Sequence, residues 1–102
     1  MFTFDKKNYC LKYNIKRIEM IEQVTEMPTL AEIRKTGGML GLKSLKTYFA
    51  YGLKEEGADA FMPVQKGYEM CESLIERDGY ENIVAAVLEA IQRDCPFFFQ
   101  GA

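Results

Sequence analysis

The side chains that most often carry catalysis are scarce in this sequence. Histidine is absent, which removes the most common general acid–base group and the most common metal ligand. The carboxylate pairs Glu19 with Glu22 and Glu55 with Glu56 have no neighbour that would tune an acid–base dyad, so we interpret them as solvated helix faces. The sequence therefore predicts a protein that is not an enzyme and that uses no cofactor and no metal.

Three cysteines, Cys10, Cys71 and Cys95, are the remaining candidate nucleophiles. Their odd number and wide spacing do not fit a disulfide framework, and the sequence has no CxxC pair for a zinc site. Cys71 and Cys95 fall on apolar faces of predicted helices, where cysteine packs as a small hydrophobic side chain. We expect reduced, partly buried thiols with a structural role.

One hypothesis is a small helical nucleic-acid-binding regulator that uses residues 29–54. Two predicted helices flank a glycine-containing break there, and four basic residues lie around it: Arg34, Lys35, Lys43 and Lys46. A recognition helix presents polar and basic side chains to the DNA major groove, whereas the second helix here carries Tyr48, Phe49 and Tyr51. The net charge of -2 also disfavours nucleic acid as a partner. We keep the regulator as the alternative function.

Length and periodicity predict the fold. The 102 residues suffice for one domain, and Phe2 and Phe4, then Tyr9, Leu11 and Tyr13, alternate with polar residues around a turn, which predicts a two-stranded β-hairpin. Helical spacing of apolar residues predicts helices at residues 15–27, 29–35, 42–56, 64–78 and 80–95. The predicted fold class is mostly α (α+β): an N-terminal hairpin followed by four to five short helices in one compact bundle, residues 1–102.

Local signals mark two of the helix starts. Asn14 is expected to be the N-cap of the helix at residues 15–27. Thr29 and Glu32 have the spacing of a capping box, with Thr29 as the N-cap of the next helix. No apolar run approaches the roughly 20 residues that span a bilayer, and no signal peptide is recognisable, so we expect a soluble cytoplasmic protein that does not bind membranes.

Two tyrosines on the helix at residues 42–56 are candidates for partner binding. Tyr48 and Tyr51 lie three residues apart, away from the apolar edge formed by Leu42, Leu45 and Phe49. They either cover the shoulder of the domain or stand exposed as anchors, because aromatic residues are enriched at protein contacts. Both interpretations remain open from the sequence.

The last residues, CPFFFQGA, place Phe97, Phe98 and Phe99 in a row. These side chains either pack against the hairpin or remain exposed and contact a partner. Adjacent residues cannot all face the same way, so at least one is expected to stay partly exposed. We include all three among the candidate partner-binding residues.

The chain resembles a known family in the order of its elements. The segment FTFDKKNYCLKYNIKRIEMIE leads from a hairpin into a helix, MPTLAEIRK and LKSLKTYFAYGL supply two more helices, and MPVQKGYEMCESLIERDGYENIVAAVLEAI closes the domain with another two. This pattern is similar to that of the small tail assembly chaperones of long-tailed bacteriophages and prophages. The resemblance covers nearly the full chain.

The resemblance implies an assembly role without catalysis. Members of this family are thought to coat the helical tape measure protein and to recruit tail tube subunits. They act in the host cytoplasm and are absent from the finished virion. Self-association is a further expectation. An amphipathic helix of the tape measure protein would lie on an apolar groove, and many copies would act together.

The resemblance also implies an origin for the phenylalanine run. Many of these chaperones are made in a short form and a longer form, the latter by programmed ribosomal frameshifting near the end of the short gene. Slippage requires runs of identical nucleotides, and phenylalanine codons can consist of thymine alone. Residues 97–99 would then reflect a slippery codon run, and the frameshifted longer form of the chain would be a further partner.

Overall fold

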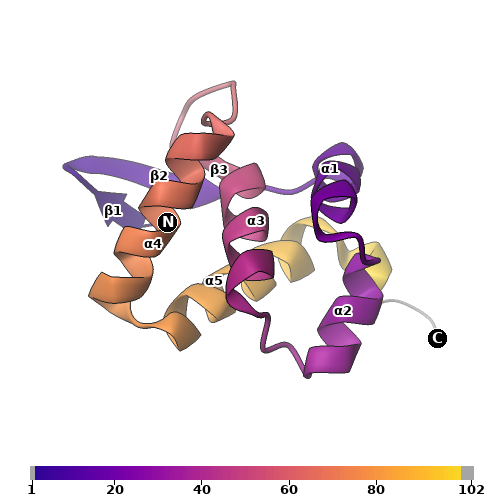
Figure 1. Cartoon of the computed structure of the whole chain (residues 1–102). Coiled ribbons are helices and arrows are strands. Elements are labelled where there is room, and N and C mark those ends of the chain that lie inside the picture. The colour runs from indigo at the N-terminus through magenta and orange to yellow at the C-terminus, as the bar shows by residue number, and fades with distance from the viewer. Residues whose placement is uncertain (1, 100–102) are drawn as a thin grey trace.

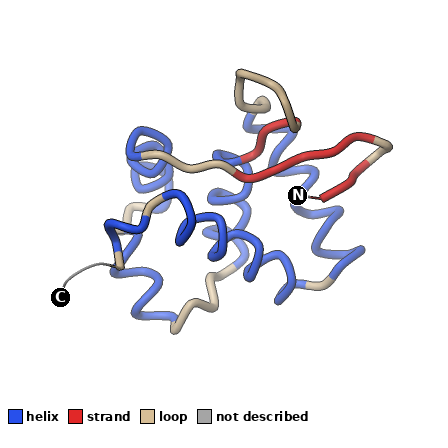
Figure 2. The backbone as a smooth tube through the Cα atoms, turned by 180° about the vertical axis from the view of Figure 1, so that it is seen from behind, coloured by secondary structure: helices blue, strands red, loops and turns tan. Residues whose placement is uncertain are grey.

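The computed structural model describes residues 2–99 and confirms a mostly α-helical α+β fold (Figure 1). Three strands, β1 (Phe2–Phe4), β2 (Lys7–Leu11) and β3 (Leu53–Glu55), form one antiparallel sheet in the order β1-β2-β3. The helices are α1 (Ile15–Thr25), α2 (Thr29–Thr36), α3 (Leu42–Gly52), α4 (Val64–Asp78) and α5 (Tyr80–Asp94), followed by the 3₁₀ turn η1 (Pro96–Phe98). Seen from behind, the strands lie along one edge of the molecule and helices make up the rest (Figure 2).

The predicted β-hairpin is present and its turn consists of two residues. Phe2 pairs with Tyr9 across the antiparallel ladder of β1 and β2. Asp5 and Lys6 join the two strands with positive φ angles of 50° and 66°. Positive φ at both central residues is the geometry of the type I′ turn, whose twist matches that of the flanking strands.

The strand β3 lies where the sequence predicted a helix continuing to residue 56. α3 ends at Gly52, and the next residue, Leu53, pairs with Leu11 of β2. The backbone N–H of Lys12 donates a hydrogen bond of 2.8 Å to the Gly52 carbonyl oxygen. Pairing with β2 supplies partners for these backbone groups and buries Leu53, which outweighs the local helical preference.

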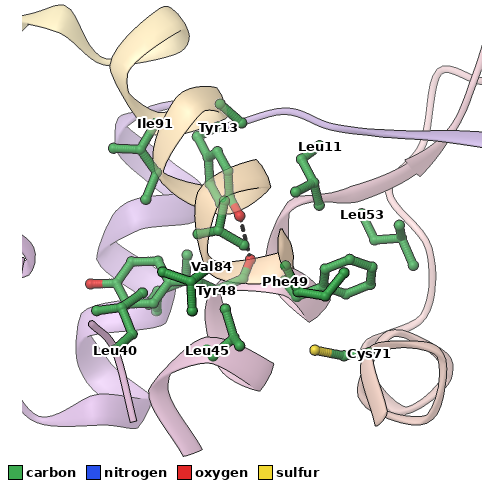
Figure 3. Packing of buried hydrophobic residues seen from close by; sticks show 14 of the residues in the cluster. Leu11, Tyr13, Leu40, Leu45, Tyr48, Phe49, Leu53, Cys71, Val84 and Ile91 are labelled. Carbon is green, nitrogen blue, oxygen red and sulfur yellow. Dashed lines mark hydrogen bonds between the residues drawn. The ribbon is translucent and has the colours of Figure 1, made fainter. Parts of the chain in front are cut away.

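The helix α3 is the centre of the fold. In Figure 1, α1 and α4 lie on either side of α3, and α5 lies behind it. The buried residues of α3, each at most 1% exposed, extend around most of its circumference: Leu45, Thr47, Tyr48, Phe49 and Ala50. Figure 3 shows Tyr48 inside the core, where the Tyr13 hydroxyl donates a hydrogen bond of 2.7 Å to the Tyr48 carbonyl oxygen.

The predicted N-cap of α1 is confirmed, but one residue of its predicted apolar stripe is exposed. The Oδ1 atom of Asn14 accepts a hydrogen bond of 2.8 Å from the Arg17 backbone N–H, so Asn14 is the N-cap. Ile18 and Ile21 are buried as expected, but Ile15 is 61% exposed. Ile15 occupies the first position of the helix, outside the part of α1 that packs on the core.

The predicted capping box of α2 is wrong. Pro28 is the N-cap, and Thr29 lies inside the helix. The backbone N–H of Thr29 donates a hydrogen bond of 2.6 Å to Oε2 of Glu22, a residue of α1, so a carboxylate from another helix performs the capping. Glu32 is buried instead, and its Oε1 atom has no hydrogen-bond partner within residues 2–99.

Hydrogen bonds join the end of α5 to the end of β2 and to the residues that follow it. The Tyr13 backbone N–H donates a hydrogen bond of 2.9 Å to Oδ2 of Asp94, and the Arg93 guanidinium donates one of 2.5 Å to the Leu11 carbonyl oxygen. Burial raises the pKa of the Asp94 carboxyl, but the Arg93 side chain and the Tyr13 N–H outweigh it and hold that pKa below its ordinary value of 3.8.

Candidate functional site

A groove of about 720 Å³ lies between α1, α3 and α4. Its walls combine apolar and charged side chains. The uncharged part comes from Val24, Leu42, Thr47, Tyr68 and Ile75, and the charged part from Lys43, Lys46, Glu72 and Glu76. We call this feature the α3–α4 groove. Its volume falls within the range of about 300–1,000 Å³ that is typical of ligand clefts.

The groove exists because α3 and α4 run antiparallel in close contact. A Cβ atom added to Gly67 of α4 would lie 2.7 Å from the Cα atom of Ala50 of α3, so only glycine permits this approach. Further along the same pair of helices, Lys46 contacts Glu72. This alignment places the first turn of α3 beside the last turns of α4, where the groove is found.

The α3 and α4 parts of the α3–α4 groove carry opposite charges, whereas α1 contributes only the uncharged Val24 to the lining. Lys43 and Lys46 belong to α3, whereas Glu72 and Glu76 belong to α4. Lys46 Nζ lies 2.5 Å from Glu72 Oε2, and this hydrogen bond raises the pKa of the Lys46 ammonium. Lys43 and Glu76 are exposed and form no ion pair within residues 2–99. They remain free to contact a bound molecule.

Leu42 provides an exposed apolar contact at the groove. The sequence placed Leu42 on the buried edge of its helix, but the side chain is 58% exposed. It occupies the first position of α3, after the N-cap Gly41, and lines the groove. The half-buried Ile75 also lines the groove, and the two side chains supply apolar area that a partner could cover.

The expectation that Tyr48 faces a partner is wrong. Tyr48 is fully buried, its hydroxyl donates a hydrogen bond of 3.0 Å to Thr29 Oγ1, and burial raises its pKa to about 12. Tyr51 is half-buried, with the Arg17 guanidinium 5.4 Å from its ring centroid and donating a hydrogen bond to its carbonyl oxygen. The periodicity of α3 marked only one apolar stripe, although neighbours cover the helix on most sides.

The phenylalanine run forms a separate small surface at the end of the described chain. Phe97 and Phe99 are 47% and 45% exposed, whereas Phe98 is half-buried and packs against the core. The centroid of the Phe98 ring lies 4.9 Å from that of Phe97 and 6.4 Å from that of Phe99. The expectation that at least one of the three stays exposed is confirmed. We call this cluster the phenylalanine tail.

The cysteines pack as the sequence predicted. All three are free thiols, with Cys71 and Cys95 fully buried and Cys10 half-buried. Burial raises the pKa of Cys71 to about 12 and also raises that of Cys95, which keeps both thiols protonated and unreactive.

Two further features of residues 2–99 limit the kinds of site. No group of three or more cysteine, aspartate or glutamate side chains is arranged to hold a metal ion there. None of the helices there combines the length and the apolar character that crossing a bilayer requires.

Sequence reasoning did not find the groove, although part of its signal was present. Lys43 and Lys46 lie three residues apart and Glu72 and Glu76 lie four apart, so each pair forms one charged edge of a helix. That the two edges face each other depends on the alignment of α3 with α4. This alignment requires the three-dimensional structure.

Comparison of the chain with protein-family models, curated proteins and solved structures finds no match.

Proposed function

We propose that this protein is a non-enzymatic tail assembly chaperone of a phage or prophage. It covers helical segments of the tape measure protein in the host cytoplasm and helps to recruit tail tube subunits. The observation that carries the proposal is the α3–α4 groove, where the exposed Leu42 lies in a cleft with lysines on one side and glutamates on the other. An amphipathic helix fits such a cleft with its apolar face inward and its polar edges toward the charges.

The modest size of the groove suits a protein that acts in many copies. One groove covers only a short length of a partner helix, so the affinity of a single contact is low. A long tape measure protein offers many such segments, and chaperones bound side by side also keep its apolar surface out of water. Overall binding then exceeds that of one contact.

The phenylalanine tail offers a second contact surface. A chaperone that brings tube subunits to a tape measure protein must contact two proteins. The exposed Phe97 lies in η1 and the exposed Phe99 directly follows it, and neither residue lines the groove. A tail tube subunit, a second copy of the chain or its frameshifted longer form would be the partner there. We also propose that the phenylalanine run at residues 97–99 reflects a slippery codon sequence in the gene.

The alternative function, a nucleic-acid-binding regulator built on residues 29–54, has less support. A recognition helix must project from the surface to enter the major groove. α3 is instead the central helix, and its middle residues from Leu45 to Ala50 are mostly buried. One of its basic residues, Lys46, is already paired with Glu72.

Two experiments test the proposed function. The first is to sequence the 3′ end of the gene and its flank. The proposal expects an all-thymine slippery run at codons 97–99 and a long overlapping frame. The second is to express the tape measure protein of the same phage or prophage with and without this chain. We expect a larger soluble fraction and a stable complex when both are present. Mixed phenylalanine codons, no second frame and an insoluble tape measure protein would contradict the proposal.

A further inference from the structure

We infer that the helix bound in the α3–α4 groove carries acidic residues along one edge and basic residues along the other, with an apolar stripe between them. The acidic edge lies against α3 and the basic edge against α4. This inference rests on the proposed function of the same groove and adds the charge order of the partner.

Two of the four charged residues of the groove, Lys46 and Glu72, already neutralise each other. Lys46 and Glu72 pair across the groove at 2.5 Å, and Lys46 Nζ also lies 5.9 Å from the centroid of the Tyr68 ring. Both contacts hold the Lys46 side chain in place, and its side chain is 27% exposed. A bound helix therefore gains little from meeting Lys46 or Glu72, because each already has its opposite charge.

Lys43 and Glu76 are the two charged groove residues that can select a partner helix by its charge. Lys43 precedes Lys46 by about one turn of α3, and Glu76 follows Glu72 by about one turn of α4. The two helices run antiparallel, with Gly67 against Ala50 and Lys46 against Glu72, so Lys43 and Glu76 come to the same end of the helix pair. Their sequence neighbours Leu42 and Ile75 also line the groove. The apolar stripe of a helix that covers Leu42 and Ile75 therefore has an ammonium on one side and a carboxylate on the other.

This arrangement discriminates between helices by the sign of their edges. A helix that is acidic on both edges gains contact with Lys43 but meets Glu76 with a like charge, and a helix that is basic on both edges has the opposite conflict. Only a helix with one edge of each sign satisfies both residues. The charge contacts of Lys43 and Glu76 with the helix are exposed to solvent, so they weaken as the ionic strength rises.

Three synthetic peptides test the inference. Each has about 20 residues and the same apolar stripe at helical spacing, about 30 Å long when helical. Their edges are acidic and basic, both acidic, or both basic. Binding to the full chain is measured by fluorescence anisotropy at low and high salt. We expect the mixed peptide to bind about two- to fivefold more tightly than either of the others at low salt, with the difference shrinking at high salt.

Two charge reversals serve as matched variants, because Lys43 and Glu76 are exposed and circular dichroism can verify that both variants fold. K43E should prefer the peptide that is basic on both edges, and E76K the one that is acidic on both edges. Equal binding of all three peptides, unchanged by either variant, would overturn the inferred charge order and leave the groove as a helix-binding site. If no peptide binds, the charge order and the use of this groove for helices are both contradicted.

Discussion

A Cβ atom at position 67 of α4 would lie 2.7 Å from the Cα atom of Ala50 in α3, which is closer than any relaxed contact. This approach brings the two helices together and so defines one wall of the α3–α4 groove. Alanine at position 67 must push α3 and α4 apart.

We therefore expect G67A to lower the free energy of unfolding. Overpacking costs about 1–3 kcal/mol, which offsets or exceeds the gain of about 1 kcal/mol from the higher helix propensity of alanine. Urea unfolding followed by circular dichroism measures the difference. S73A, an exposed substitution on the same helix, is the control and should change little. A G67A variant more stable than wild type would show that the helices have room to separate.

The burial of Tyr48 predicts a sharp contrast with Tyr51. Y48S removes a fully buried ring and its hydrogen bond to Thr29, which should cost about 3–5 kcal/mol and leave the protein close to unfolding. Y51S removes a half-buried ring and should cost clearly less. Thermal denaturation of both variants checks this order. Equal losses of stability, or a stable Y48S protein, would mean that Tyr48 is not part of the core.

Two glutamates near the start of α2 should respond in opposite ways to the same change. E22L removes the acceptor of the Thr29 N–H, so we expect a loss of about 1–3 kcal/mol. E32L removes a buried carboxyl whose Oε1 atom has no partner within residues 2–99, so stability should stay the same or rise. Chemical denaturation of the two variants makes the comparison. A loss at position 32 as large as that at position 22 would reveal a partner for Glu32.

Acid should weaken the contact between α5 and the segment after β2. The pKa of Asp94 is lower in the folded protein than its ordinary value of 3.8, so its stabilising effect is present above that value and is lost as the pH falls through the folded pKa. D94N should therefore be less stable than wild type near about pH 7, and the difference should shrink as the pH falls below 3.8. D59N, in an exposed loop, is the control. A difference between D94N and wild type that does not change with pH would contradict this assignment.

The parts of the fold that depend on local sequence were predictable. The alternation around the hairpin, the Asn14 cap and the bounds of α4 at residues 64–78 follow from side chains that lie near each other in the chain. Each is governed by backbone geometry and periodicity within a few residues.

The parts that depend on distant contacts were not predictable. Leu53 forms a strand because it pairs with Leu11, which lies 42 positions earlier in the sequence (53 − 11). Tyr48 is buried because several elements surround α3, whereas a periodic pattern marks one face only. Leu42 fits the apolar spacing of α3 but lies at its first position, beside a groove that exists only after α3 and α4 have packed.

A matched pair of substitutions tests the proposal that the α3–α4 groove binds a helix of the tape measure protein. Leu42 and Ile15 each occupy the first position of a helix and are 58% and 61% exposed, but only Leu42 lines the groove. Aspartate is favourable at the N-terminus of a helix, so L42D and I15D should both fold, which circular dichroism verifies.

The measurement is the soluble fraction of the tape measure protein, co-expressed with wild type, L42D or I15D. A covered leucine contributes about 1.5–3 kcal/mol, so L42D should weaken binding about tenfold or more and leave most of the tape measure protein insoluble. I15D should match wild type. An L42D protein that keeps the tape measure protein soluble as well as I15D does would contradict the claim that this groove is the binding site.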